Sequence, residues 1–555
     1  ETAEKNEDWF FSEQNRNKVQ ILRAIRSIAY ESGLFERCAA LLKRFVLNEA
    51  PGGRESAVDP LKSLFSLYLS GTHASAAQRA AVINALLESS VAAEQELGLT
   101  LLGEMLKTSH FTSHYSFEFG AWKRDFGLHP ASGGQVRDWY MQVIETSRAA
   151  EASGSRLSGR VRRVMANHVA DLLRIGMLDE VIALARAFTG NSGWPEGWIG
   201  VRNAVRRGNG KLSEFALKKL EQLEKRLRPS DLAGMIRSYA LSPEWSALDI
   251  ADLDEDEELK PLEARQKVHD VCTDLGQQLA ADLMQLDALL PEIVASDSSK
   301  TFALGRGLAT GCASIAECWS RLRDEFLKIP EGKRQAQLLS GFLASAVAHS
   351  AEETESLLDE ILADPRLNPY LLYWQANAGV NVKAFERLMK ELAIDTVPVS
   401  SFGLLANGRA HEGLDDEQLR QILRGITGKD GGNSVATQIL GMRVFGKLSD
   451  KLPITESLKA TGREFLAKVE LEKGAHFDHM IGHIIEVSFD KQEYEDQARA
   501  FCSRILSEIR RWNVYAWDLS ETITALTKTS PVVILDMLVE QAAGADGTGQ
   551  RVFQD

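Results

Sequence analysis

The chain has 555 residues, too many for one compact hydrophobic core, so we expect several domains or an array of repeats. An apolar fraction of 44% and a charged fraction of 26% exclude a disordered, collagen-like or coiled-coil protein. The 64 basic and 78 acidic residues leave a net charge of −14. This balance argues against a nucleic-acid binder and against a membrane-surface protein, because a protein that binds nucleic acid or an anionic membrane needs a dominant cationic surface.

The cysteines and the start of the chain indicate in which cellular compartment the protein is expected. The five cysteines lie far apart and include no Cys-x-x-Cys pair, so neither a disulfide framework nor a zinc ribbon is expected. Most stand among apolar residues, which predicts buried thiols and a reducing, cytosolic compartment. The sequence contains no run of about 18 apolar residues, so no membrane span is predicted. The acidic start lacks a methionine and differs from a signal peptide, so we expect a piece of a longer or processed chain.

Apolar residues recur at steps of three and four along nearly the whole chain, which predicts amphipathic helices. The first helical pair joins residues 22–29 to residues 35–45. In a later pair, residues 161–173 form one apolar stripe that Gly176 ends, because glycine enters the left-handed region without strain. The next stripe starts at Leu178. Helices joined by such short turns are expected to form antiparallel hairpins.

The second half of the chain continues in the same way. Residues 268–283 form a long stripe that we expect to break at Pro291, since proline has no backbone N–H to donate. Ser350 and Asp415 each stand three residues before a glutamate or glutamine, which is the spacing of a capping box at a helix start. Strand-like patterns are nearly absent, and residues 396–401 are the best short candidate.

These patterns predict an all-α fold, a superhelical array of antiparallel helical hairpins of the tetratricopeptide-like or α-solenoid type. The pairs recur at roughly 35 to 45 residues, and residues 304–308 and 339–343 lie about one period apart. We predict three segments. Residues 1–150 form an N-terminal helical region with an aromatic-rich insertion (110–140), residues 151–255 form helical-hairpin repeats, and residues 256–555 form a C-terminal helical-repeat solenoid.

Motifs that would indicate catalysis are missing from the sequence. A phosphate-binding loop needs Gly-x-x-x-x-Gly-Lys followed by serine or threonine, and residues 208–211 come nearest but lack the upstream glycine and the hydroxyl. Neither the Gly-x-Ser-x-Gly nor the His-Glu-x-x-His pattern occurs. We therefore expect no enzyme activity, no catalytic residue and no cofactor in this chain.

One arrangement has the spacing of a metal site. His476, His479 and His483 follow steps of three and four, which on a helix would bring three imidazoles to one face within reach of a single zinc ion. The alternative is that these histidines are exposed or pack against a neighbouring helix. We favour the alternative and expect no metal site.

Aromatic and basic residues suggest where a partner could bind. Residues 110–140 are rich in aromatics, which either bind a partner or fix a long loop to its own scaffold. We favour the structural role for most of them and expect Trp122, Lys123 and Arg124 to face outward. Together with Trp194 and Trp198, these are the predicted protein-binding residues.

Several segments resemble a known family. Residues 64–72 followed by Arg79, and then residues 110–113 and 117–120, resemble part of the bacterial antiviral STAND ATPases, the Avs proteins. In those proteins a helical-repeat region lies C-terminal to the ATPase. The same resemblance extends to residues 303–310, 477–487 and 531–536.

The resemblance implies a function for this chain. It would be the sensor of an antiphage defence protein and would bind a conserved phage structural or packaging protein, such as the terminase large subunit or the portal. Binding would drive homo-oligomerisation of the parent ATPase and activate its N-terminal effector. Two alternatives stay open: a housekeeping tetratricopeptide-like adaptor for a host protein or peptide, and an enzyme whose site is built from scattered residues such as the histidines.

Overall fold

The computed structural model describes most of the chain, namely residues 10–11, 17–49, 56–112, 124–153, 157–189, 193–208, 213–242, 260–394, 397–471 and 477–542. All regular structure within these residues is α-helix or 3-10 helix, which confirms the predicted all-α fold. None of the described helices is both long and apolar enough to cross a membrane.

The helices pack as two units, Glu1–Val271 and Cys272–Asp555. The described helices of the first unit are α2 (Lys18–Ile28), η1 (Ser32–Leu34), α3 (Phe35–Leu47), α4 (Val58–Ser63), α5 (Ala76–Leu87), α6 (Ala92–Met105), α7 (Gly133–Ala152), α8 (Ser158–Asn167), α9 (Val169–Arg174), α10 (Leu178–Thr189), α11 (Pro195–Gly208), α12 (Glu214–Leu227) and α13 (Leu232–Tyr239). Helix α15 (Pro261–Ala280) runs from the first unit into the second.

In the first unit, each helix packs on helices that are close to it in the sequence. Helix α5 contacts α6 and α7, α7 contacts α8, and α8 contacts α11, which in turn packs on α12 and α13. Helices on both sides of residue 150 are therefore in contact. The other predicted segment boundary, near residue 255, lies outside the described residues, and the three-segment division stays a prediction.

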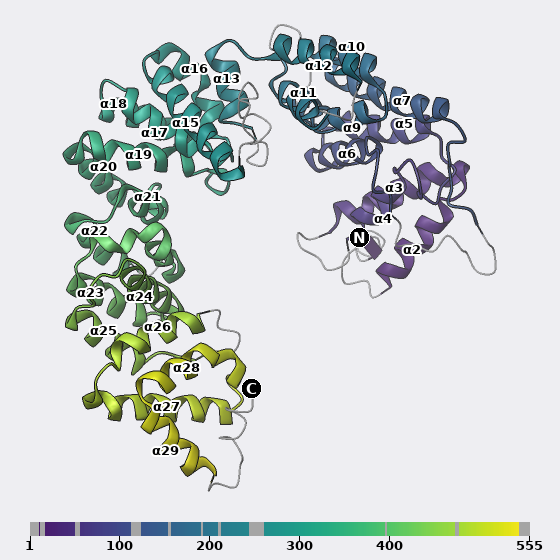
Figure 1. The fold of residues 1–555 in the computed structure, drawn as a ribbon. Helices are drawn as coiled ribbons and strands as arrows, with labels where there is room; N and C mark the ends of the chain where they lie inside the picture. The colour runs from purple at the N-terminus through teal and green to yellow at the C-terminus, as the bar shows by residue number, and fades with distance from the viewer. Residues whose placement is uncertain are drawn as a thin grey trace, which may run out of the picture. The chain divides into compact units, whose positions relative to one another are not determined.

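In the second unit, successive helical pairs stack in two rows (Figure 1). The first row after α15 contains α17 (Thr301–Gly311), α19 (Gln337–His349), α21 (Leu371–Ala378), η5 (Val399–Gly413), α24 (Gly432–Ser449), α26 (Asp478–Ser488) and α28 (Ser520–Thr529). The second row contains α16 (Leu283–Val294), α18 (Ile315–Lys328), α20 (Ala351–Ala363), α22 (Val382–Leu392), α23 (Asp416–Thr427), α25 (Glu456–Leu466), α27 (Glu495–Arg510) and α29 (Pro531–Ala542). Short 3-10 helices lie between these elements: η3 (Glu331–Lys333), η4 (Asn368–Tyr370), η6 (Gln492–Tyr494) and η7 (Ala516–Leu519).

This stacking is the arrangement of an α-solenoid, in which each pair contacts mainly its neighbours. From Leu372 onward, the buried apolar residues form one cluster, of which Ile439 is a fully buried member. Nearer the start of the unit, Leu275 and Leu308 are each 1% exposed or less. In the first unit, Leu172 is likewise fully buried, as its apolar stripe predicts.

Glycines bring the first-row helices into very close contact at the start of the second unit. A Cβ on Gly307 would lie 1.9 Å from a carbonyl oxygen of α15, and one on Gly341 would lie 1.9 Å from a carbonyl oxygen of α17. A Cβ on Gly305 would lie 2.1 Å from a carbonyl oxygen of α19. No other residue type fits these positions without moving the helices apart. Residues 304–308 and 339–343, which the sequence places one period apart, are thus contact segments of neighbouring helices.

Arginines link one helical pair to the next by donating to carbonyl groups at helix ends. Arg443 on α24 donates to the carbonyl of Leu414, 2.9 Å away, just after η5. Arg504 on α27 donates to the last residue of α25 at 2.7 Å, and Arg463 on α25 donates to the last residue of α26 at 3.1 Å. These carbonyls have no partner within their own helix, so a neighbouring side chain satisfies them.

The predicted helix signals have mixed outcomes. Asp415 forms the expected capping box with Gln418, and Gly176 adopts the expected left-handed conformation with φ of 86°. Ser350 does precede α20, but its side chain makes no capping hydrogen bond, so that capping box was wrong.

Two other expectations about the backbone need correction or qualification. The break expected at Pro291 was wrong, because this proline lies inside α16; the chain turns earlier, at Asp282, whose side chain accepts from the N–H of Gln285. The candidate strand lies partly outside the described residues. Of its described part, residues 397–401, the last three residues belong to η5 and none lies in a strand.

We predict that Gly341→Ala weakens the second unit. The added methyl would overlap a backbone carbonyl of α17, and overpacking of this kind costs about 1–3 kcal/mol or more. The matched control is Gly332→Ala in η3, where a Cβ would meet nothing within 4 Å. Urea unfolding followed by circular dichroism should show a lower midpoint for Gly341→Ala only. Equal midpoints for both variants would show that the helices do not pack this closely.

Candidate protein-interaction surface

Arg79 of α5 holds an irregular loop of the first unit in one conformation. Its guanidinium is fully buried and donates to the carbonyl of Ser66 at 2.6 Å and to the hydroxyl of Ser70 at 3.2 Å. The same group lies over the ring of Trp139, 4.8 Å from its centroid. Burial lowers the pKa of Arg79 to about 9, so the side chain remains protonated at neutral pH. We call residues 64–72 the arginine-held loop.

Arg26 of α2 also holds the arginine-held loop. This buried side chain donates to the hydroxyl of Ser63 at 2.9 Å and to the carbonyl of Ser70 at 3.2 Å. Ser70 therefore receives hydrogen bonds from two buried cations. A loop held by several charge-assisted hydrogen bonds keeps its shape in the unbound protein.

The segment that follows residue 123 docks onto the arginine-held loop. The N–H of Gly71 donates to the carbonyl of Phe126 at 3.0 Å, and the N–H of Leu128 donates to the carbonyl of Thr72 at 2.8 Å. Gly127 between them has a φ of 82°, and a Cβ there would lie 2.4 Å from the nitrogen of Thr72. Only glycine combines this backbone conformation with such a close approach.

This docking assembles four polar side chains at the surface, Tyr30, His73, Arg124 and Asp125, which we call the polar quartet. One carboxylate oxygen of Asp125 accepts from the hydroxyl of Tyr30 and from Nε2 of His73, each at 3.1 Å. The guanidinium of Arg124 lies 4.4 Å from the ring centroid of Tyr30 and donates to the carbonyl of Ser27 at 2.5 Å.

The ionisation of the quartet follows from these contacts. Partial burial by itself would raise the pKa of Asp125, but hydrogen bonds from Gly127, Tyr30 and His73 outweigh this effect and hold that pKa below its usual value. Partial burial, reinforced by the bond to Asp125, raises the pKa of Tyr30. At neutral pH the quartet therefore presents an ionised carboxylate, a neutral phenol and a guanidinium.

The quartet is suited to binding. The side chains of His73 and Asp125 are 40% and 61% exposed, and Arg124 and Tyr30 are half-buried. Tyrosine and arginine are the residue types that carry much of the binding energy in protein interfaces. Because these side chains are already ordered by one another, binding would cost little conformational entropy.

The structure places the predicted binding residues in different environments. Arg124 belongs to the quartet, while Trp122 and Lys123 lie outside the described residues. Trp194 and Trp198 are each 1% exposed, so neither ring can contact a partner at the surface of this fold. The assignment of these two tryptophans to a binding surface is therefore corrected to a structural role.

Local contacts explain why both tryptophans are buried. The indole N–H of Trp194 donates to a carbonyl of α8, and that of Trp198 donates to the carboxylate of Glu224 at 2.8 Å. A Cβ on Gly197 would lie 2.0 Å from the ring of Trp194, so this glycine lets the ring fold back over α11. The Trp-Pro-Glu-Gly-Trp sequence is thus the packed start of a helix, with Pro195 at its first position.

The sequence alone did not indicate the other quartet members. Tyr30 and Asp125 are 95 residues apart, and no local pattern connects them. The structural role favoured for the aromatic segment is seen in Trp139 and Tyr140, which are buried and donate to the carbonyls of Met105 and Lys107.

The three histidines with metal-like spacing are only partly described. His476 lies outside the described residues, and the ring centroids of His479 and His483 are 6.5 Å apart. Asp478 beside them accepts from the backbone N–H groups of Glu521 and Thr522, at the start of α28. Within the described part of the chain, no group of three or more His, Cys, Asp or Glu side chains is arranged to hold a metal ion.

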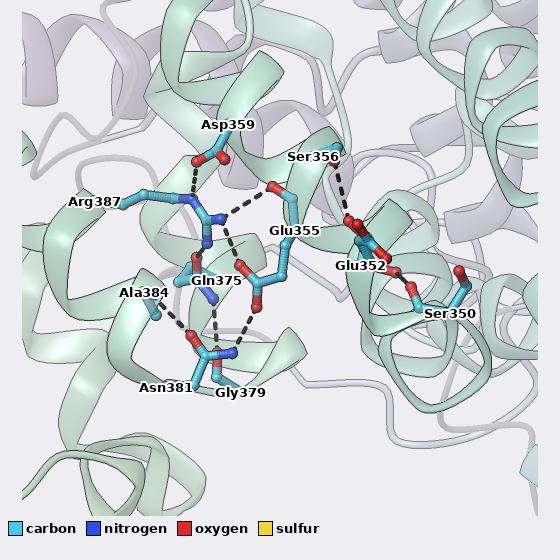
Figure 2. A network of polar contacts seen from close by, with 11 residues as sticks. Ser350, Glu352, Glu355, Ser356, Asp359, Gln375, Gly379, Asn381, Ala384 and Arg387 are labelled. Atoms are coloured by element: carbon cyan, nitrogen blue, oxygen red, sulfur yellow. Dashed lines mark hydrogen bonds and ion pairs between the residues drawn. The ribbon is translucent and has the colours of Figure 1, made fainter.

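A second polar network lies inside the second unit and joins α20, α21 and α22 (Figure 2). Arg387 of α22 donates to Glu355 at 2.5 Å, to Asp359 at 2.7 Å and to Gln375 at 2.9 Å. Asn381 donates to the other carboxylate oxygen of Glu355 at 2.6 Å. Arg387 and Glu355 are buried, and both are paired and hydrogen-bonded, as buried charges must be. This network fixes α22 to α20 and is structural.

Comparison with protein families finds no family model that matches the chain, and comparison with curated proteins finds no match either. The resemblance to the Avs proteins therefore stays an expectation.

We predict that Arg79→Met loosens the arginine-held loop. The substitution leaves the carbonyl of Ser66 without its buried donor, which costs about 1–3 kcal/mol. Hydrogen exchange measured by mass spectrometry should be about tenfold faster or more in peptides that contain Gly71 and Leu128. Arg137→Met, at an arginine that is 52% exposed in the same unit, serves as the control. Unchanged exchange in Arg79→Met would mean that the loop is held by other contacts.

A double-mutant cycle tests the buried network. Arg387→Met should destabilise the second unit by about 3–5 kcal/mol, because it leaves the carboxylate of Glu355 buried without its counter-ion. Adding Glu355→Met should restore part of this loss in urea unfolding. Arg366→Met, at an arginine that is 65% exposed, should change little. If the double variant is as unstable as the sum of the two single variants, the pair is not coupled.

Proposed function

We propose that this chain is a non-catalytic scaffold that recognises a folded protein, with the polar quartet as part of the contact surface. The observation that carries the proposal is the arginine-held loop. A buried guanidinium, Arg79, is committed to fixing a loop whose neighbours Tyr30, His73, Arg124 and Asp125 are presented to solvent. Such preordered polar and aromatic groups favour specific recognition of a protein surface.

We further propose that the pairs of the second unit follow a tetratricopeptide-like superhelix. Its first-row helices α17, α19 and α21 begin at Thr301, Gln337 and Leu371, a spacing close to the roughly 34 residues of tetratricopeptide repeats. Arrays of this type offer an extended surface that binds a partner through many weak contacts.

The partner that we propose is a conserved phage protein of the structural or packaging class, such as the terminase large subunit or the portal. On this proposal the chain is the sensor region of a cytoplasmic antiviral STAND ATPase, and binding promotes oligomerisation of the parent protein and effector activation. The support is the resemblance to the Avs proteins. Two of its elements, residues 64–72 and Arg79, are the ones that shape the proposed surface.

The test uses the purified chain as bait in lysates of phage-infected and uninfected bacteria, with captured proteins identified by mass spectrometry. We expect a viral protein from infected cells only. The double variant His73→Ala/Arg124→Ala should reduce its capture about tenfold or more, since loss of hot-spot side chains costs about 2 kcal/mol. The matched control is His479→Ala/Arg366→Ala, which removes an exposed histidine and an exposed arginine in the other unit.

Each outcome decides one part of the proposal. Recovery of the same host protein from both lysates would replace the antiviral sensor by a housekeeping adaptor. Equal capture of a viral protein by the quartet variant and the control would keep the sensor and remove the quartet from its contact surface.

A further inference from the structure

Element η5 is interrupted by a sharp turn at Asn407, Gly408 and Arg409. Gly408 and Arg409 both adopt the left-handed conformation, with φ of 55° and 63°. Glycine does so without strain, whereas a residue with a side chain is less stable there by about 1–2 kcal/mol. All three residues are exposed. The turn therefore breaks the helical backbone at the surface and depends on other contacts to keep Arg409 in place.

Ion pairs hold Arg409 in this conformation. Its guanidinium donates to the carboxylates of Glu412 and Asp450, and Asp450 directly follows α24. Gly446 on α24 leaves room for these side chains, since a Cβ there would lie 3.2 Å from a carboxylate oxygen of Glu412 and 3.6 Å from the guanidinium of Arg409. One arginine thus ties the turn to the end of α24.

Asn407 differs from the other described asparagines in the residue that follows it. Among the asparagines that the structure describes, it is the one that precedes a glycine; the other Asn-Gly pair of the sequence, at residues 209–210, lies outside the described residues. A Cβ on Gly408 would meet nothing within 4 Å, so the space beside its backbone nitrogen is open. A side chain at this position would screen the nitrogen from an approaching group, and glycine has none.

The side-chain amide of Asn407 is free to rotate. Within the described part of the chain, no hydrogen bond holds it. By contrast, the amide of Asn377 donates to the carbonyl of Tyr373 at 2.9 Å, and that of Asn513 donates to the carboxylate of Glu508 at 2.7 Å. Rotation about the exposed bonds of Asn407 therefore brings its amide carbon to the backbone nitrogen of Gly408.

We propose that Asn407 is a site of spontaneous covalent modification, deamidation through a cyclic imide. The backbone nitrogen of Gly408 loses its proton and attacks the side-chain amide carbon of Asn407. The new C–N bond closes a succinimide ring, the bond from that carbon to the amide nitrogen breaks, and ammonia leaves with the proton.

Water then opens the ring at either of its two carbonyl carbons. Opening at the side-chain carbonyl yields aspartate. Opening at the main-chain carbonyl yields isoaspartate, in which the backbone continues through the side chain. In total, an amide and a water become a carboxylate and an ammonium ion, so neither an oxidant nor a reductant is needed.

Both products change the turn beside Arg409. Each places a new carboxylate next to a guanidinium that already pairs with Glu412 and Asp450, and isoaspartate also lengthens the main chain. The left-handed backbone of Arg409 persists only while the surrounding contacts hold it. The modification therefore loosens the connection between η5 and the end of α24, independently of any binding at the polar quartet.

The test is incubation of the purified full chain at mildly alkaline pH, with peptide mass spectrometry at intervals. We expect the peptide with Asn407 to convert from amide to acid about tenfold faster or more than those with Asn377 and Asn513, a barrier lower by about 1.4 kcal/mol. The rate should rise in proportion to hydroxide, because the attacking nitrogen must lose its proton. Asn407→Gln, which would have to close a larger ring, should stay unmodified. Equal rates at the three asparagines would overturn the proposal.

A second measurement tests the effect on the turn. Ion exchange separates the modified chain, which carries an additional negative charge, from the unmodified chain. Hydrogen exchange should be several-fold faster in the modified fraction for peptides that contain residues 410–414, and unchanged for peptides of α17. Freshly prepared Asp450→Asn, which removes a partner of Arg409 and leaves Asn407 intact, should show the same local increase. Unchanged exchange in the modified fraction would overturn the link between the modification and η5.

Discussion

Hydrogen bonds from buried and half-buried arginines to main-chain carbonyls are the interaction on which the rest of this structure depends. Stacked helical pairs leave carbonyl groups without partners at every helix end, and water cannot reach those that are buried. Arg443 and Arg504 satisfy such groups on the preceding pair, and Arg79 does the same for an irregular loop. The planar guanidinium carries several donors in fixed directions, so one side chain joins two or three backbone segments.

A second constraint acts beside the first. Where α15, α17 and α19 meet, glycines such as Gly307 and Gly341 replace side-chain packing by direct contact between backbones. Such contact tolerates no change in helix spacing, whereas an arginine bridge tolerates small adjustments of its side chain. The second unit thus combines direct backbone contacts at glycines with connections through long polar side chains.

How much could be read from the sequence depended on the range of the interaction. The capping box at Asp415 and the left-handed Gly176 involve residues a few positions apart, and the sequence was sufficient. The burial of Trp198 depends on Glu224, which lies in the following helix, so composition alone suggested an exposed binding residue. The polar quartet could not be predicted from the sequence, because Tyr30 and Asp125 come into contact only in the folded chain.

Because these arginines donate to backbone carbonyl groups, their hydrogen bonds respond to acid differently from ion pairs. A peptide carbonyl does not titrate, and a guanidinium keeps its proton throughout the range in which carboxylates are neutralised. Ion pairs on the surface differ: bonds from Arg424 and Arg420 hold the pKa of Glu464 to about 2, so their contribution fades as the pH falls through that value. The bond of Arg504 to the end of α25 is unaffected there. Acidification would therefore weaken the ion pairs of the array while the arginine bonds to carbonyl groups persist.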